Sequence, residues 1–171
     1  MSTATRPNTW TRNVRAGSSR VAAADLEAAI PVGASLLIDT SVVLAYLTGT
    51  EPTSQAATQV LDAFVATGRN PAALSMVTVG EILVRPFRRG SAAVATAEGF
   101  LRHFAEMRLV EVSYDVAREA ARIRAATNLR TPDALIIATA VVTETDILVT
   151  SDRSWRTTAD ALPLAVRILV L

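Results

Sequence analysis

Two aspartates follow aliphatic segments that are typical of buried strands. Asp39 comes directly after Leu36–Ile38, and Asp152 follows the segment Ile147–Ser151. A carboxylate at the end of a buried strand is costly to desolvate unless it is paired or binds a metal ion, and the chain has no lysine to pair with it. These positions therefore predict a site at the strand ends. The alternative is that each aspartate caps the helix or turn that follows it.

Two further acids stand in segments with a helical pattern. Asp133 follows Thr131, a predicted N-cap, and Pro132, a predicted first helical residue. The alternative for Asp133 is to complement the helix dipole. Glu81 lies within the apolar segment Thr78–Val84, with a solvated helix edge as its alternative. Together with the two aspartates, these acids form a candidate set of ligands.

The residue types that are absent narrow the chemistry. The chain has no cysteine, which excludes disulfides, thiol nucleophiles and cysteine metal sites. All 17 basic residues are arginine, so P-loop and Schiff-base lysines are excluded. The single histidine, His103, cannot supply the several imidazoles of typical zinc or iron sites. A metal site must therefore be built from oxygen, which indicates Mg²⁺, Mn²⁺ or Ca²⁺.

The pattern of the chain predicts the elements that would position these acids. The 171 residues suit one domain, and the longest segment without a charged residue has 11 positions, whereas a membrane-spanning helix needs about 20 apolar residues. Short aliphatic segments alternate with amphipathic ones, which predicts an α/β fold with three α/β/α layers and a mainly parallel sheet of about five strands. The predicted strands are Leu36–Ile38, Ala72–Ser75, Leu109–Val112, Ile147–Val149 and Val166–Val170. The predicted helices are Val42–Leu47, Ser54–Thr67, Val77–Val84, Ser91–Glu106, Tyr114–Thr127 and Pro132–Thr143.

Residues 1–34 precede the first predicted strand. We expect them to form an N-terminal extension with a short helix near Arg20–Ile30, and residues 35–171 to form the α/β domain. The first 24 residues contain four arginines and lack the apolar core of a signal peptide, so we expect a cytoplasmic protein. The alternative for this arginine-rich start is an organelle transit sequence.

The acids and their flanking residues resemble those of the PIN-domain family, and most of all the VapC-type toxins of prokaryotic toxin–antitoxin pairs. The matching segments are Leu36–Ser41, Val79–Leu83, Asp133–Ala140 and Leu148–Asp152. They occur in the family's order and with family-like spacing, and the resemblance covers about residues 35–171. The 34 residues before the first strand depart from the usual toxin, which begins close to that strand.

This resemblance implies a metal-dependent endoribonuclease that uses Mg²⁺ or Mn²⁺ and leaves a 5′-phosphate and a 3′-hydroxyl. The family's acidic quartet carries over onto Asp39, Glu81, Asp133 and Asp152. We expect the three aspartates to bind the metal, and Glu81 to orient the attacking water or a second ion. The supporting hydroxyls would be those of Thr40, Ser41 and Thr150. The family further implies an RNA substrate, an antitoxin that covers the site, and commonly a homodimer.

The charge balance bears on an RNA partner. The formal net charge of +1 is low for a nucleic-acid-binding protein. If a metal neutralised the four proposed ligands, 17 arginines would face 12 remaining acids, a net charge of +5. The candidate phosphate contacts are Arg85, Arg88, Arg89, Arg153 and Arg156, each with a solvated surface role as its alternative. Pairing with local acids such as Glu119, or contact with a partner chain, is an equal alternative for Arg118, Arg122 and Arg130.

Three other functions fit parts of this pattern. A phosphotransfer or phosphatase domain also places an aspartate after its first strand, but its site generally needs a lysine. A catalytically inactive PIN-like module would bind RNA or another protein without cleavage, and the presence of all four acids argues against it. A purely structural α/β protein would use the acids only as caps, which the joint pattern disfavours.

Overall fold

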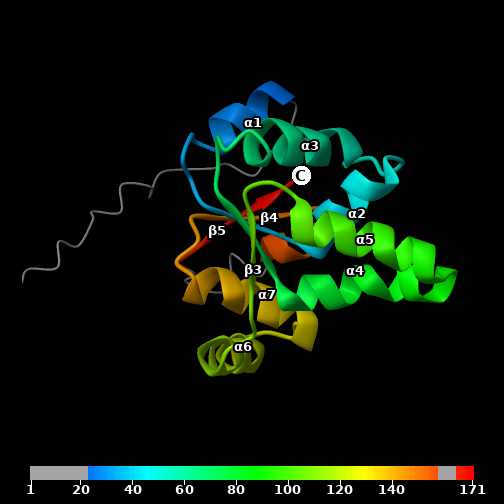
Figure 1. Cartoon of the computed structure of the whole chain (residues 1–171). Helices are drawn as coiled ribbons and strands as arrows, with labels where there is room; N and C mark the ends of the chain where they lie inside the picture. Colours follow the sequence, from blue (N-terminus) through cyan, green and yellow to red (C-terminus); the bar gives the residue numbers. More distant parts are fainter. Residues whose placement is uncertain (1–22, 158–164) are drawn as a thin grey trace, which may run out of the picture.

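The structure, a computed structural model, describes residues 23–157 and 165–171. Five parallel strands form one sheet in the order β3-β2-β1-β4-β5, with helices on both faces (Figure 1), which confirms the predicted α/β fold. The strands are β1 (Leu36–Ile38), β2 (Ala72–Ser75), β3 (Met107–Val110), β4 (Ile147–Thr150) and β5 (Arg167–Val170). The helices are α1 (Ala23–Ala29), α2 (Thr40–Thr48), α3 (Ser54–Thr58), η1 (Gln59–Val65), α4 (Met76–Arg89), α5 (Ser91–His103), α6 (Tyr114–Ala126) and α7 (Thr131–Val142). None of the described helices is long and apolar enough to cross a membrane.

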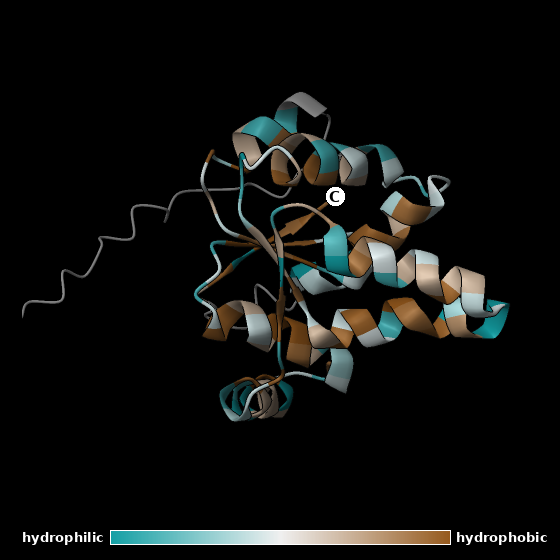
Figure 2. Ribbon diagram, in the orientation of Figure 1, coloured by the Kyte–Doolittle hydropathy of each residue, from teal (hydrophilic) through white to brown (hydrophobic). Residues whose placement is uncertain are grey.

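Each face of the sheet has its own hydrophobic core. Successive residues of a strand point to opposite faces, and Leu36 and Ile38 belong to one buried cluster while Leu37 between them belongs to the other. The first cluster includes residues of α1, α2, α3 and η1, and the second includes residues of α6 and α7. Strands β1, β2 and β4 are buried along their whole length and contain mainly apolar residues, as expected for strands that are covered on both faces (Figure 2).

Helix α4 is longer than the sequence pattern predicts. The predicted helix Val77–Val84 extends in the structure from Met76 to Arg89, with Pro86 inside it. Proline removes its own N–H donor, yet the helix continues for three residues beyond it. It ends at Gly90, whose φ of 107° is in the region that favours glycine.

Other predicted elements also differ from the structure in their bounds or type. The single helix predicted over Ser54–Thr67 is α3 followed by the π-helix η1, where Ala66 N donates to Leu61 O, five residues earlier, at 2.8 Å. The strand predicted at Leu109–Val112 lies two residues earlier, as β3. Hydrophobicity alone does not distinguish α-helical from π-helical hydrogen bonding, or place the ends of a short edge strand.

The start of α7 is one residue earlier than predicted. The helix begins at Thr131, so Arg130 is the N-cap in place of Thr131. Pro132 is tolerated there because the first N–H groups of a helix have no partner within it.

Helix α1 is joined to the rest of the fold by apolar packing and by hydrogen bonds. Leu26 and Ile30 are completely buried in the first core cluster. Arg69 Nη2 donates to the Ile30 carbonyl at 2.9 Å, and Arg167 donates to the Ala29 carbonyl. Two guanidinium groups therefore satisfy carbonyls at the carboxyl end of α1, where such groups lack partners within the helix.

The helix predicted near Arg20–Ile30 is confirmed from residue 23 onward, and residues 20–22 lie outside the described residues. The division of the chain into an extension over 1–34 and a domain over 35–171 stays a prediction. The burial of Leu26 and Ile30 shows that the described part of that extension contributes to the core.

Replacing Leu26 by alanine should lower the free energy of unfolding by about 2–5 kcal/mol, because the change removes buried methyl groups and leaves a cavity. Urea unfolding followed by circular dichroism measures the change. Val32→Ala is the control, since Val32 is 77% exposed and should shift stability by no more than about 0.5 kcal/mol. Equal midpoints for Leu26→Ala and wild type would contradict the packing of α1.

Candidate active site

Asp39 follows the central strand β1 and is only 4% exposed. Its Oδ2 accepts hydrogen bonds from Ser41 Oγ at 2.5 Å and from Thr150 Oγ1 at 2.8 Å. Burial raises the pKa of the Asp39 carboxyl above its usual value, and these hydrogen bonds offset the rise only in part. Asp39 is also the N-cap of α2, accepting from Ser41 N at 3.3 Å. Asp39 is therefore both the cap of α2 and a buried candidate ligand.

The carboxyl ends of β1 and β4 define the position of the site. The chain continues from β1 to β2 and β3 on one side of the sheet, and then to β4 and β5 on the other. Such a reversal of strand order in a parallel sheet places a crevice beyond the carboxyl ends of the two strands. Ser151 N donates to Ser41 Oγ at 2.8 Å, which joins the segments after β4 and β1 beside Asp39.

Glu81 on α4 is connected to this region through a hydroxyl of α2. Thr40 Oγ1 donates to Glu81 Oε2 at 2.5 Å and lies 3.2 Å from Thr78 Oγ1. Thr40 is buried, whereas Glu81 as a whole is exposed. Glu81 thus lies at a solvated helix edge, which was the alternative to a role in the site. Its carboxylate nevertheless accepts a hydrogen bond from Thr40, the residue next to Asp39.

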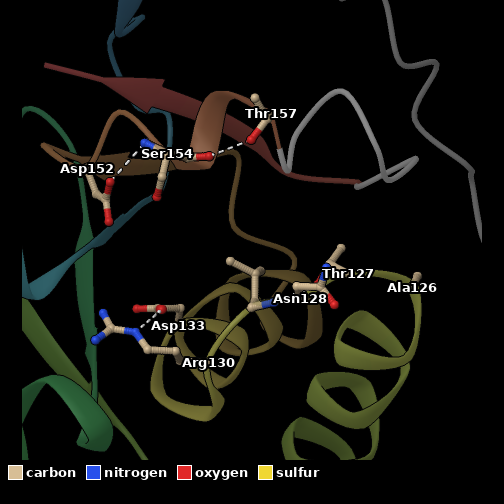
Figure 3. Close-up of a pocket in the computed structure, with 9 residues that line it drawn as sticks. Ala126, Thr127, Asn128, Arg130, Asp133, Asp152, Ser154 and Thr157 are labelled. Atoms are coloured by element: carbon tan, nitrogen blue, oxygen red, sulfur yellow. Dashed lines mark hydrogen bonds and ion pairs between the residues drawn. The ribbon is translucent and has the colours of Figure 1, made fainter.

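Asp133 and Asp152 line one pocket of about 470 Å³, together with Arg130 (Figure 3). Asp133 lies in the first turn of α7, and Arg130 Nε donates to its Oδ2 at 3.2 Å. Asp152 Oδ1 accepts from Ser154 N at 2.8 Å, so Asp152 caps the turn that follows it. Its own N–H donates to Thr150 Oγ1 at 3.0 Å. Thr150 therefore joins the pocket to Asp39.

The four acids do not form a ready metal site. Within residues 23–157 and 165–171, no three acidic or histidine side chains form a group that could hold a metal ion. Each carboxylate instead has its own donor: hydroxyls for Asp39 and Glu81, a guanidinium for Asp133 and a backbone N–H for Asp152. Unpaired carboxylates close together would repel one another. The roles of the three aspartates as metal ligands stay predictions.

Two contacts at the site were not predicted. The partner of Arg130 was left open, although Asp133 stands three residues later, a spacing at which helical side chains meet. The role of Ser151 as a backbone donor to Ser41 was also missed. No local sequence signal indicates that contact, because the two residues are 110 positions apart.

The arginines expected to contact RNA divide into two groups. Arg85 and Arg153 line a second pocket of about 400 Å³, together with Ser41 and Ser151. Because Ser41 bonds to Asp39, this pocket adjoins the buried acid. The remaining three are exposed and line neither pocket; they are Arg88, Arg89 and Arg156. His103, at the carboxyl end of α5, is exposed and lines neither pocket.

The model of the PIN domain family matches residues 36–161, and the chain belongs to the PIN-domain family. This match includes all four predicted acids. No curated protein matches the chain.

Solved structures share the fold. VapBC2 from Rickettsia felis, bound to a promoter DNA fragment, has a TM-score of 0.59 at 13% identity, covering 80% of this chain and 98% of that one. FitAcB from Neisseria gonorrhoeae has a TM-score of 0.59 at 21% identity, covering 78% and 96%. VapC20 from Mycobacterium tuberculosis, a toxin that cleaves the sarcin-ricin loop, has a TM-score of 0.59 at 19% identity, covering 77% and 98%. At these identities the likeness shows the fold.

The raised pKa of Asp39 predicts a pH dependence of stability with a defined sign. The unperturbed carboxyl titrates near 3.8, and the folded chain keeps this proton to higher pH. Stability should therefore fall as pH rises from that value through the folded-state pKa. The Asp39→Asn variant should not show this decrease in stability with rising pH. It should be more stable than wild type at neutral pH, because it no longer buries a charge.

Thermal unfolding at a series of pH values without divalent ions measures this difference. Asp115→Asn is the control, since it removes an exposed carboxylate from the first turn of α6. Parallel curves for Asp39→Asn and wild type at all pH values would contradict the effect.

Proposed function

We propose that this PIN-domain protein is a metal-dependent endoribonuclease that hydrolyses RNA phosphodiester bonds. The observation that supports it most is the buried carboxylate of Asp39, held between the ends of β1 and β4 and joined through Thr150 to the pocket of Asp133 and Asp152. A carboxylate that only caps a helix does not need to be buried, whereas a buried carboxylate is stabilised when it binds a cation. Membership of the PIN-domain family and the RNA-cleaving activity of VapC20 support the same conclusion.

The side-chain atoms that the predicted site residues offer to a metal ion are of the chemical type that Mg²⁺ and Mn²⁺ bind. They are carboxylate and hydroxyl oxygens, which both ions prefer. We assign Asp39, Asp133 and Asp152 as direct or water-mediated ligands, and Glu81 as the residue that orients the attacking water or a second ion. A bound divalent ion supplies polarisation of the phosphate and lowers the pKa of a water.

The hydroxyl groups set the orientation of two of these acids. Ser41 and Thr150 both donate to Oδ2 of Asp39, which restricts the rotation of its carboxylate. Thr40 restricts Glu81 in the same way. Neutral donors orient a ligand without cancelling its charge, which is the role of supporting groups around a metal site.

RNA would approach this site along its arginines. We assign Arg85 and Arg153 as contacts to phosphates near the cleaved bond, because the second pocket, which they line, adjoins Asp39 through Ser41. Three more exposed arginines are proposed as further phosphate contacts; they are Arg88, Arg89 and Arg156.

The proposed biological role is that of a toxin in a cytoplasmic toxin–antitoxin pair. A similar structure from Klebsiella pneumoniae is a toxin–antitoxin complex, which supports an antitoxin as partner of this chain. We propose that the antitoxin covers the site and that the chain forms a homodimer. Val84 and Phe87 on α4 are 46% and 67% exposed, which provides apolar surface for a protein partner.

The second candidate is an inactive PIN-like module that binds RNA or protein. The observation that favours it is that no three acids among the described residues form a group ready for a metal ion. The two candidates differ in turnover, so a cleavage assay separates them.

Asp39→Asn and Asp133→Asn should each abolish cleavage while the protein stays folded, because each change removes a negative metal ligand. The assay incubates the protein with structured small RNAs in Mg²⁺ or Mn²⁺, with and without a chelator, and maps the product ends. Asp115→Asn should cleave as wild type does. Normal cleavage by Asp39→Asn would overturn the assignment, and an absence of cleavage by folded wild type would favour the inactive module.

Arg85→Gln and Arg153→Gln should each weaken RNA binding and reduce the slope of log affinity against log salt by about one, the loss of one phosphate contact. Fluorescence anisotropy of a labelled RNA at several salt concentrations measures both effects. Arg118→Gln is the control, because Arg118 is exposed on α6 and lines neither pocket. Equal salt-dependence slopes for all three variants and wild type would show that the arginines of the second pocket do not contact the RNA backbone.

A further inference from the structure

Arg130 occupies a helix position at which arginine is not among the preferred residues. It is the N-cap of α7, and its side chain makes no capping hydrogen bond. Serine, threonine, aspartate and asparagine are preferred at this position because they accept from the free N–H groups of the first turn. A cation here also lies near the positive end of the helix dipole. A residue that contradicts local preference in this way points to a functional constraint.

The side chain of Arg130 is directed to Asp133. Its Nε donates to Asp133 Oδ2 at 3.2 Å, and the structure shows no other ion pair or side-chain hydrogen bond of Arg130 within its described residues. The Arg130 side chain is 82% exposed, whereas that of Asp133 is 16% exposed. Both border the pocket that Asp152 also lines (Figure 3). A solvent-exposed cation therefore pairs with a largely buried carboxylate at the pocket.

Asp133 differs in this respect from Asp39. The donors to Asp39 are neutral hydroxyls, which leave its negative charge in place. The donor to Asp133 carries a full positive charge. A divalent cation and a guanidinium compete for the same carboxylate because both are positive and both bind its oxygens. A metal ion that binds Oδ2 of Asp133 would therefore take the place of Arg130 Nε.

We propose that Arg130 is an internal counter-cation for Asp133, which pairs with the carboxylate in the metal-free protein and is displaced by a divalent ion. This inference rests on the proposed function, since it treats Asp133 as a metal ligand. The guanidinium is exposed and can turn into solvent without disturbing the core. Exposed ion pairs of this kind change an equilibrium by about two- to fivefold, so the pair would weaken metal binding without preventing it.

The test is a calorimetric titration of the full chain with MnCl₂ in the absence of RNA. Arg130→Gln should bind Mn²⁺ about two- to fivefold more tightly than wild type, because the ion no longer displaces a cation. Arg130 is 82% exposed, so its replacement leaves the core unchanged, and thermal unfolding checks this.

Two variants serve as matched controls. Arg122→Gln removes a cation that forms the same i, i+3 pair, with Glu119 at 2.6 Å on α6, and neither residue lines either pocket. Arg153→Gln removes a cation that lines the second pocket and has no bond to Asp133. Both control variants should bind Mn²⁺ about as tightly as wild type does, and therefore less tightly than Arg130→Gln.

The outcomes separate this inference from the proposed function. If wild type binds Mn²⁺ and Arg130→Gln binds it equally or more weakly, Arg130 only positions Asp133 and the inference fails alone. Equal tightening in Arg153→Gln would indicate a general charge effect and would also overturn it. If no variant binds Mn²⁺, both the inference and the metal-dependent function fail.

Discussion

The charge of Asp39 is the constraint on which the site depends. A carboxylate at the end of a central strand has lost most of its water, and its hydrogen bonds with Ser41 and Thr150 compensate only part of that loss. One of these hydroxyls belongs to α2 and the other to β4. The hydrogen bond from Thr150 therefore both stabilises the anion and joins the neighbouring ends of β1 and β4, so that stability and site geometry share this contact.

The other acids show a common arrangement with different donors. Glu81 uses the hydroxyl of Thr40, Asp152 uses the N–H of Ser154, and Asp133 uses the guanidinium of Arg130. Separate donors reduce the cost of holding like charges near one another, since each carboxylate accepts at least one hydrogen bond from a donor of its own. The fold thus tolerates a set of acids around one crevice before any cation is present, and only Asp133 has a partner that carries charge.

Much of the fold was predictable because buried strands have a simple pattern. Leu36–Ile38 is apolar throughout since both faces of β1 are covered, and Asp39 after it marks the strand end. Long-range contacts were not predictable: Ser151 and Ser41 meet only because β1 and β4 are neighbours. The path of α4 through Pro86 also escaped prediction, because local preference disfavours it. The candidate acids could be identified from the sequence. The hydrogen-bond donor of each acid could be identified only from the three-dimensional structure.

The order of the strands has a consequence for the protein during its synthesis. β1 receives its neighbour β4 only after residues 147–150 have been made, and the hydrogen bond between Thr150 and Asp39 spans 111 positions. At roughly 5–20 residues per second, a nascent chain carries Asp39 for on the order of ten seconds before that hydroxyl exists. During this interval neither the β1–β4 crevice nor Asp152 is present. An incomplete chain therefore has no assembled site, and any activity begins only when nearly the whole domain has been translated.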